Sequence, residues 1–84
     1  SMGDGKKYHR QKYAAYSIQV GSFSDKENAK DAMKGLQDLG FTPSLEEYEE
    51  YTRVVIKGIP PNSLEDMKQK LSLIGYSSVL IRAE

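Results

Sequence analysis

The chain of 84 residues contains no cysteine, one histidine and only three prolines. The absence of cysteine excludes disulfides, thiolate metal sites and thiol catalysis, and it leaves the redox compartment undetermined. No apolar run approaches the ~20 residues that a membrane-spanning helix needs, so we expect no membrane contact by this segment. A chain of this length is sufficient for one small domain.

Positive and negative charges are unevenly distributed, although the formal net charge is zero. Residues 1–14 contain four basic residues and one acidic residue, whereas residues 15–84 contain eight basic and eleven acidic residues. The first segment is polar and lacks a sustained period, so we expect a disordered basic tail or linker end, with Ser1-Met2-Gly3 left by an expression tag. The second segment is the predicted domain, and its acidic balance argues against a partner with a phosphate backbone.

Alternation of apolar and polar residues over 16–23 predicts a strand with one buried and one open face. Ile18 and Val20 are predicted to face the core. Gln19 and Gly21 are predicted to lie on the opposite face, so that an amide side chain sits in mid-strand away from the core.

Two amphipathic helices follow, and each ends at a glycine. Ser24 and Glu27 have the spacing of a capping box, which predicts a first helix over about 25–39 that ends at Gly40. A second helix is predicted after Pro60-Pro61-Asn62-Ser63. The predicted buried stripes are Ala29, Ala32, Met33, Leu36 and Leu39 in the first helix, and Leu64, Met67, Leu71 and Ile74 before Gly75 in the second.

Three more strands are predicted, over 41–46, over 51–59 and in the last segment after Tyr76. Pro43 favours an edge position for the second of the four strands. Because the run starting at Ile18 overlays the run starting at Val54, the two halves repeat strand, helix and strand. The order βαββαβ predicts an α+β split-βαβ fold (ferredoxin-like or RNP-like). Its four-stranded antiparallel sheet has strands one and three in the centre, both helices on one face and the other face open.

The uncovered face is predicted to mix polar, charged, aromatic and aliphatic side chains. Such a mixture suits a flat polar ligand with apolar ring faces, such as a sugar chain. A half-solvated sheet with Arg53 paired to Glu46 is the alternative. The acidic residues around Tyr48 are predicted to form a solvated turn that matches no calcium loop, and no metal or cofactor is expected. The predicted members of this face are Gln19, Gly21, Ser44, Glu46, Tyr51, Arg53, Val55, Lys57 and Leu80, with Ser22 at its corner.

Four segments of the chain form a combination that is found in a known family. They are Tyr16-Ser17-Ile18-Gln19-Val20-Gly21-Ser22-Phe23, 25–29, Gly40-Phe41 and Arg53-Val54-Val55-Ile56. Through them the chain resembles the SPOR (sporulation-related repeat) domain over about 15–83. The resemblance implies the same βαββαβ fold and a non-catalytic module. It also implies binding of bacterial septal peptidoglycan, with a preference for glycan strands that lack stem peptides. By the same resemblance we expect the protein in the bacterial cell envelope, periplasmic or extracytoplasmic, at the division septum.

Carried over by position, the resemblance implies five glycan-binding residues, which are Gln19, Ser22, Tyr51, Arg53 and Leu80. Two departures from the family pattern occur on the third strand. Tyr51 stands where tryptophan is frequent and should stack less strongly, and 57–59 replaces a frequent Gly-Pro-Phe.

The residue chemistry suggests how such a site would work. Gln19 offers a donor and an acceptor for N-acetyl and hydroxyl groups, and Ser22 adds a hydroxyl. Arg53 could form a bidentate pair with the lactyl carboxylate that is exposed when the stem peptide is absent. Tyr51 and Leu80 could support apolar sugar faces.

Other classes of function share this topology. An RNP-like module for single-stranded nucleic acid would need stacking aromatic residues where Gln19 and Val55 stand, so no nucleic-acid partner is expected. A small-molecule regulatory module would normally bind at a dimer interface, whereas we expect a monomer. An enzyme would need a nucleophile and base in a cleft, but the only histidine, His9, lies in the tail.

Overall fold

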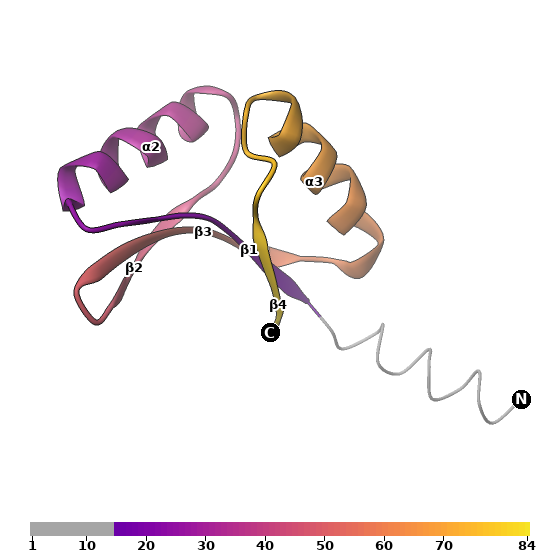
Figure 1. Ribbon diagram of the computed structural model, residues 1–84. Helices are drawn as coiled ribbons and strands as arrows, with labels where there is room; N and C mark the ends of the chain where they lie inside the picture. The colour runs from indigo at the N-terminus through magenta and orange to yellow at the C-terminus, as the bar shows by residue number, and fades with distance from the viewer. Residues whose placement is uncertain (1–14) are drawn as a thin grey trace, which may run out of the picture.

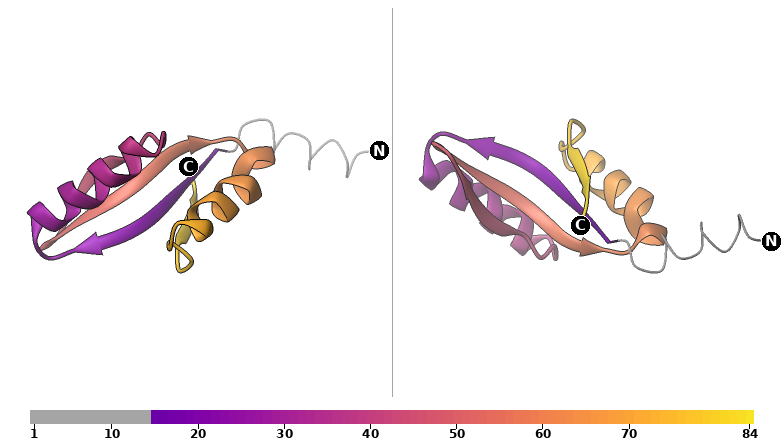
Figure 2. Two further views of the ribbon diagram at one scale, coloured as in Figure 1. Left: turned by 90° about the horizontal axis from the view of Figure 1, so that it is seen from above. Right: turned by 90° about the horizontal axis from the view of Figure 1, so that it is seen from below.

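The computed structural model describes residues 15–84, which form a four-stranded antiparallel sheet and two α-helices (Figure 1). The strands lie in the order β2-β3-β1-β4, with β1 and β3 in the centre as predicted. The two helices lie on one face of the sheet and leave the other uncovered (Figures 1 and 2). This confirms the predicted α+β fold. The elements are β1 (Tyr16–Phe23), α2 (Lys26–Asp38), β2 (Ser44–Tyr48), β3 (Tyr51–Ile59), the 3-10 turn η1 (Pro61–Ser63), α3 (Leu64–Leu73) and β4 (Leu80–Ala83).

The predicted basic tail and His9 fall in residues 1–14, outside the described part of the chain. Within the described part, neither helix is long and apolar enough to cross a membrane.

The core lies between the helices and the sheet. Its strand residues include Ile18 and Val20 of β1, as predicted, and the helices contribute Ala29, Leu36 and Leu71. Burying each of the larger apolar side chains stabilises the fold by about 1.5–3 kcal/mol. The core cluster consists of Ile18, Val20, Ala29, Leu36, Val54, Ile56, Ile59 and Leu71.

Leu39 and Ile74 do not belong to the buried helix faces, so this part of the prediction is wrong. They are 61% and 39% exposed, respectively. Each is the C-cap residue of its helix, where the chain turns away from the helical path. The left-handed residues that follow, Gly40 at φ +95° and Gly75 at φ +103°, end the helices as predicted.

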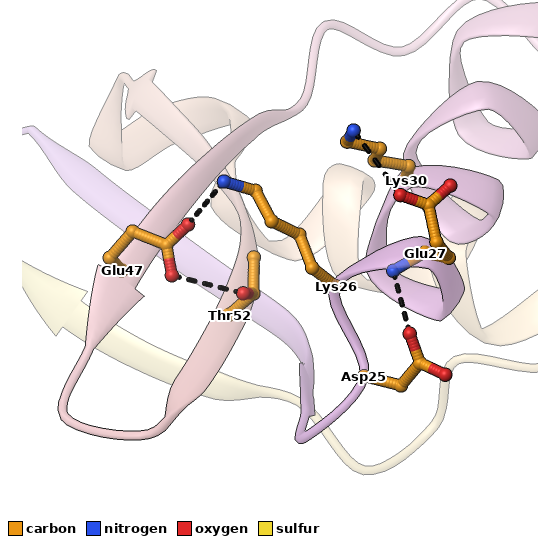
Figure 3. Close-up of polar contacts among 6 residues, drawn as sticks. All are labelled: Asp25, Lys26, Glu27, Lys30, Glu47 and Thr52. Carbon is orange, nitrogen blue, oxygen red and sulfur yellow. Dashed lines mark hydrogen bonds and ion pairs between the residues drawn. The ribbon is translucent and has the colours of Figure 1, made fainter.

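The first helix is capped by Asp25 and not by Ser24. The Asp25 carboxylate accepts a hydrogen bond of 2.9 Å from the backbone N–H of Glu27 (Figure 3). Asp25 has extended backbone angles, and a short acidic side chain at this position satisfies one of the free N–H groups of the first turn. The predicted capping box between Ser24 and Glu27 is therefore wrong.

The second strand starts and ends later than predicted. β2 begins at Ser44, because Phe41 still belongs to the helix ending, where its N–H donates to the carbonyl of Leu36 at 3.0 Å. Pro43 directly precedes the strand, which occupies the predicted edge position. Tyr48 is the last residue of β2 and pairs with Tyr51, so its predicted place in the turn is wrong.

A polar contact connects the β2–β3 hairpin to the start of α2 (Figure 3). Glu47 accepts a hydrogen bond of 3.0 Å from the hydroxyl of the buried Thr52, and its other oxygen lies 3.0 Å from Nζ of Lys26. The hydrogen bond from Lys26, followed by that from Thr52, holds the pKa of Glu47 below its ordinary value of 4.5.

Candidate functional site

The pairing of β1 with β3 includes one extra residue in β1. Gln19 lies opposite Val55, whereas Gly21 lies opposite the adjacent residue of β3, Val54. Two steps along β1 therefore match one step along β3, which is the signature of a β-bulge. Because Val54 is fully buried in the core, its partner Gly21 also faces the helices. The prediction that Gly21 belongs to the open face is wrong.

Beyond the bulge the alternation resumes, which brings Ser22 onto the open face directly opposite Arg53. Gly21 is half-buried, and a Cβ atom there would lie only 2.8 Å from the ring of Phe23. A residue without a side chain thus allows the bulge and Phe23 to pack on the same side. Because of the bulge, Ser22 lies on the open face within β1. The sequence had predicted it at the corner of that face.

The side chains of the open face form rows across the strands. All five residues implied by the family resemblance lie in three consecutive rows, and the sheet brings them together from three strands. The first row is Ser44, Val55, Gln19 and Leu80, the second is Glu46, Arg53 and Ser22, and the third is Tyr48 and Tyr51.

Val55 is placed on the open face as predicted, but it is only 4% exposed. It lies outside the core cluster on the helix side. Its neighbours on the open face are Gln19 and Ser44 across the strands, and Arg53 and Lys57 along β3. The centre of this face is therefore a packed apolar spot surrounded by polar side chains.

Arg53 is engaged by two residues of β2. Its Nη1 lies 3.6 Å from Oε1 of Glu46, and its Cζ lies 3.7 Å from the centroid of the Tyr48 ring. Lys57 approaches the other oxygen of Glu46 at 3.4 Å. The Arg53 side chain is consequently only 16% exposed, and its pairing with Glu46 is the contact named for the alternative, a half-solvated sheet. Stacking of a guanidinium on a tyrosine adds to the ion pair and holds both side chains in place.

Gln19 is held by Arg82 of β4. Nη2 of Arg82 donates a hydrogen bond of 2.9 Å to Oε1 of Gln19. This bond uses one lone pair of the amide oxygen and leaves the NH₂ group of Gln19 as a donor. Leu80, directly opposite Gln19, is 58% exposed.

Tyr48 and Arg82 lie on this face but were not among its predicted members. The alternation of Glu46 and Tyr48 was a usable signal for Tyr48, had the strand been extended past the acidic residues. Arg82 lies two residues beyond Leu80 and therefore shares its side of β4, but its contact with Gln19 depends on β4 pairing with β1.

Chemically, the open face combines exposed apolar surface with fixed hydrogen-bonding groups. Tyr48 and Tyr51 are 47% and 46% exposed and lie side by side across the hairpin. Ser22 and Gln19 provide a hydroxyl and an amide. In residues 15–84, no three histidine, cysteine, aspartate or glutamate side chains are close enough together to hold a metal ion. The arrangement suits contact with a flat, extended, polar molecule.

The family model described as SPOR domain matches residues 12–82 of the chain. No curated protein matches the chain. Among solved structures, the fold is similar to the solution structure of the peptidoglycan binding domain of the B. subtilis cell wall lytic enzyme CwlC, with a TM-score of 0.70. The two chains are 18% identical, and the similarity covers 84% of this chain and 90% of the other. At this identity the similarity concerns the fold.

Proposed function

The chain belongs to the SPOR domain family, and on this premise we propose that residues 15–84 form a non-catalytic module that binds peptidoglycan. Its ligand is the glycan strand without stem peptides, and it acts as a monomer in the bacterial envelope, at the division septum. The similar fold of the peptidoglycan binding domain of CwlC supports the coarser part of this proposal. One observation carries the choice of the binding surface: the five positions implied by the family resemblance share one uncovered face of the sheet.

The shape of the open face favours an extended ligand. From Leu80 on one edge to Tyr51 the distance is roughly 17 Å, because two strand spacings of about 4.8 Å separate β4 from β3 and four residues separate the rows. Exposed apolar groups at both ends can support sugar faces, while Gln19 and Ser22 between them bond hydroxyl and N-acetyl groups. A ligand with repeating rings and repeating polar substituents meets this pattern along its length.

Arg53 acts on the binding surface mainly through its contacts with other side chains, because little of it is exposed to a ligand. Its guanidinium is engaged by Glu46 and Tyr48, so these three side chains hold one another in place next to Val55. A stem peptide on the glycan would add bulk over this packed part of the face, which favours strands from which the peptide has been removed.

Co-sedimentation with purified sacculi tests the proposal. We expect more protein to pellet with amidase-treated sacculi than with intact sacculi, and Gln19→Ala to stay in the supernatant. Gln37→Ala is the matched control, because Gln37 is an exposed residue of α2 on the opposite side of the molecule. Circular dichroism melts of the variants should agree with that of the parent protein.

Two results would contradict the proposal. If Gln19→Ala pelleted as well as the parent protein, the open face would not be the binding site. If intact and treated sacculi retained equal amounts of protein, the proposed preference for denuded strands would be refuted, whereas the proposed binding of peptidoglycan would stand.

A further inference from the structure

Three cationic side chains lie on the open face, and their partners differ. Arg53 and Lys57 both contact the carboxylate of Glu46, at 3.6 and 3.4 Å. Arg82 contacts the neutral amide oxygen of Gln19, and it forms no ion pair within residues 15–84. Two of the three charges are thus already offset by one shared carboxylate, whereas the third is not.

The nearest carboxylate along the chain is directed elsewhere. Glu84 follows Arg82 by two residues, but its Oε2 accepts a hydrogen bond of 3.0 Å from the N–H of Gly58. Arg82 itself is an exposed residue of β4, the edge strand next to β1. Its guanidinium therefore remains accessible from solvent on the open face.

The chemistry of this side chain defines what it can bind. A guanidinium carries five N–H donors in a planar fork and stays charged at every physiological pH. One donor is used on Gln19, which leaves enough of the fork for a bidentate pair with a carboxylate. The same hydrogen bond turns the oxygen of Gln19 to Arg82, so its NH₂ group can donate to a ligand acceptor, such as the carbonyl of an N-acetyl group.

Resting on the function proposed above, we propose that Arg82, and not Arg53, binds the free lactyl carboxylate of the glycan strand. In a strand that carries stem peptides this carboxyl group is consumed in an amide bond and has no charge. A cation at this position therefore distinguishes strands with and without peptide by charge, in addition to any exclusion by size. Arg82 is then a specificity-determining residue, and Gln19 beside it donates a hydrogen bond to the adjacent sugar.

Soluble denuded glycan strands test this assignment in two chemical forms. One form keeps its carboxylates, and in the other they are converted to neutral primary amides with carbodiimide and ammonia. We expect the parent protein to bind the carboxylate form about tenfold more tightly, the effect of one charge-assisted hydrogen-bonded pair. Arg82→Gln should bind both forms with equal affinity, and Arg82→Lys should keep part of the preference.

Two further variants separate this role from a general effect of charge. Lys34→Gln removes one positive charge from the exposed surface of α2 and should keep the full preference. Arg53→Gln should weaken the binding of both forms and keep their ratio, because Arg53 acts through Glu46 and Tyr48. Isothermal titration of each variant with each form gives the ratio directly.

The outcomes distinguish this inference from the proposed function. A preference that survives in Arg82→Gln and disappears in Arg53→Gln would overturn the assignment of Arg82. Equal affinity of the parent protein for both forms would also overturn it, while peptidoglycan binding would stand. If the parent protein bound neither form, the proposed function itself would be refuted.

Discussion

Replacing Gly21 by alanine tests whether the β1 bulge requires a residue without a side chain. The new Cβ would lie 2.8 Å from Cε2 and 3.1 Å from Cζ of Phe23, whereas carbon atoms in contact normally lie about 3.5–4.0 Å apart. Phe23 is half-buried and packs against the core, so a shift of its ring would disturb that packing. Overpacking of this kind costs about 1–3 kcal/mol, and we expect the free energy of unfolding to fall by that amount.

A second glycine provides a matched control. Gly35 lies in an exposed part of α2, and a Cβ atom there would meet nothing within 4 Å. Gly35→Ala should therefore raise the free energy of unfolding by about 0.4–1 kcal/mol, because alanine restricts the unfolded chain and favours a helix. The same chemical change is expected to have opposite signs at the two positions.

Urea denaturation followed by circular dichroism measures both effects as shifts of the midpoint at constant slope. In a domain of this size, each kcal/mol also corresponds to about 4–8 °C in Tm. Gly21→Ala should cost less stability in a Phe23→Leu background than in the parent protein, since the two positions are in contact and coupled. If Gly21→Ala left the stability unchanged, or cost the same with Phe23→Leu present, the steric account of the bulge would be refuted.

Three other perturbations follow from the fold. Asp25→Ala should lower the free energy of unfolding by about 0.5–2 kcal/mol through loss of the helix cap, whereas Ser24→Ala should have little effect; equal losses in urea denaturation would contradict the capping assignment. Leu36→Ala, at a side chain that is 1% exposed, should cost about 2–5 kcal/mol, and a loss below 1 kcal/mol would place this residue outside the core. The hydrogen bond from Lys26 lowers the pKa of Glu47 in the folded protein, so ionised Glu47 stabilises the fold. This stabilisation is fully present above pH 4.5, the ordinary pKa, and is lost as the pH falls through the lower pKa of the folded state. Tm measured from pH 7 to 3 should fall less steeply in Glu47→Gln than in the parent protein, and parallel curves would refute this contribution.

Local sequence signals predicted most of the fold. Alternation identified β1 and β3 with their observed bounds, and glycines marked both helix ends. These features depend on periods and backbone preferences within a few residues, which a sequence displays directly. The helix start was predicted one residue early, because Ser24 and Asp25 are both good caps and the choice between them depends on the path of the chain leaving β1.

The candidate site was predictable in its membership but not in its contacts. Each of Gln19, Ser22, Tyr51, Arg53 and Leu80 was placed on the open face or its rim from alternation and resemblance. The engagement of Arg53 by Tyr48 was not predicted, because the acidic run after Glu46 reads as a turn. The bond from Arg82 to Gln19 was not predicted either, because it joins residues 63 positions apart.

Local patterns were therefore enough to reveal that the chain has four strands and two helices in this order, and which family it resembles. Only the tertiary structure decided that Gly21 turns inward, that Ser22 meets Arg53, and that Arg82 is the cation on this face without an ion-pair partner in residues 15–84. The physical reason is that a bulge and a side-chain contact depend on which residues of other strands lie opposite. That register is set by packing across the whole sheet and not by any local run of residues.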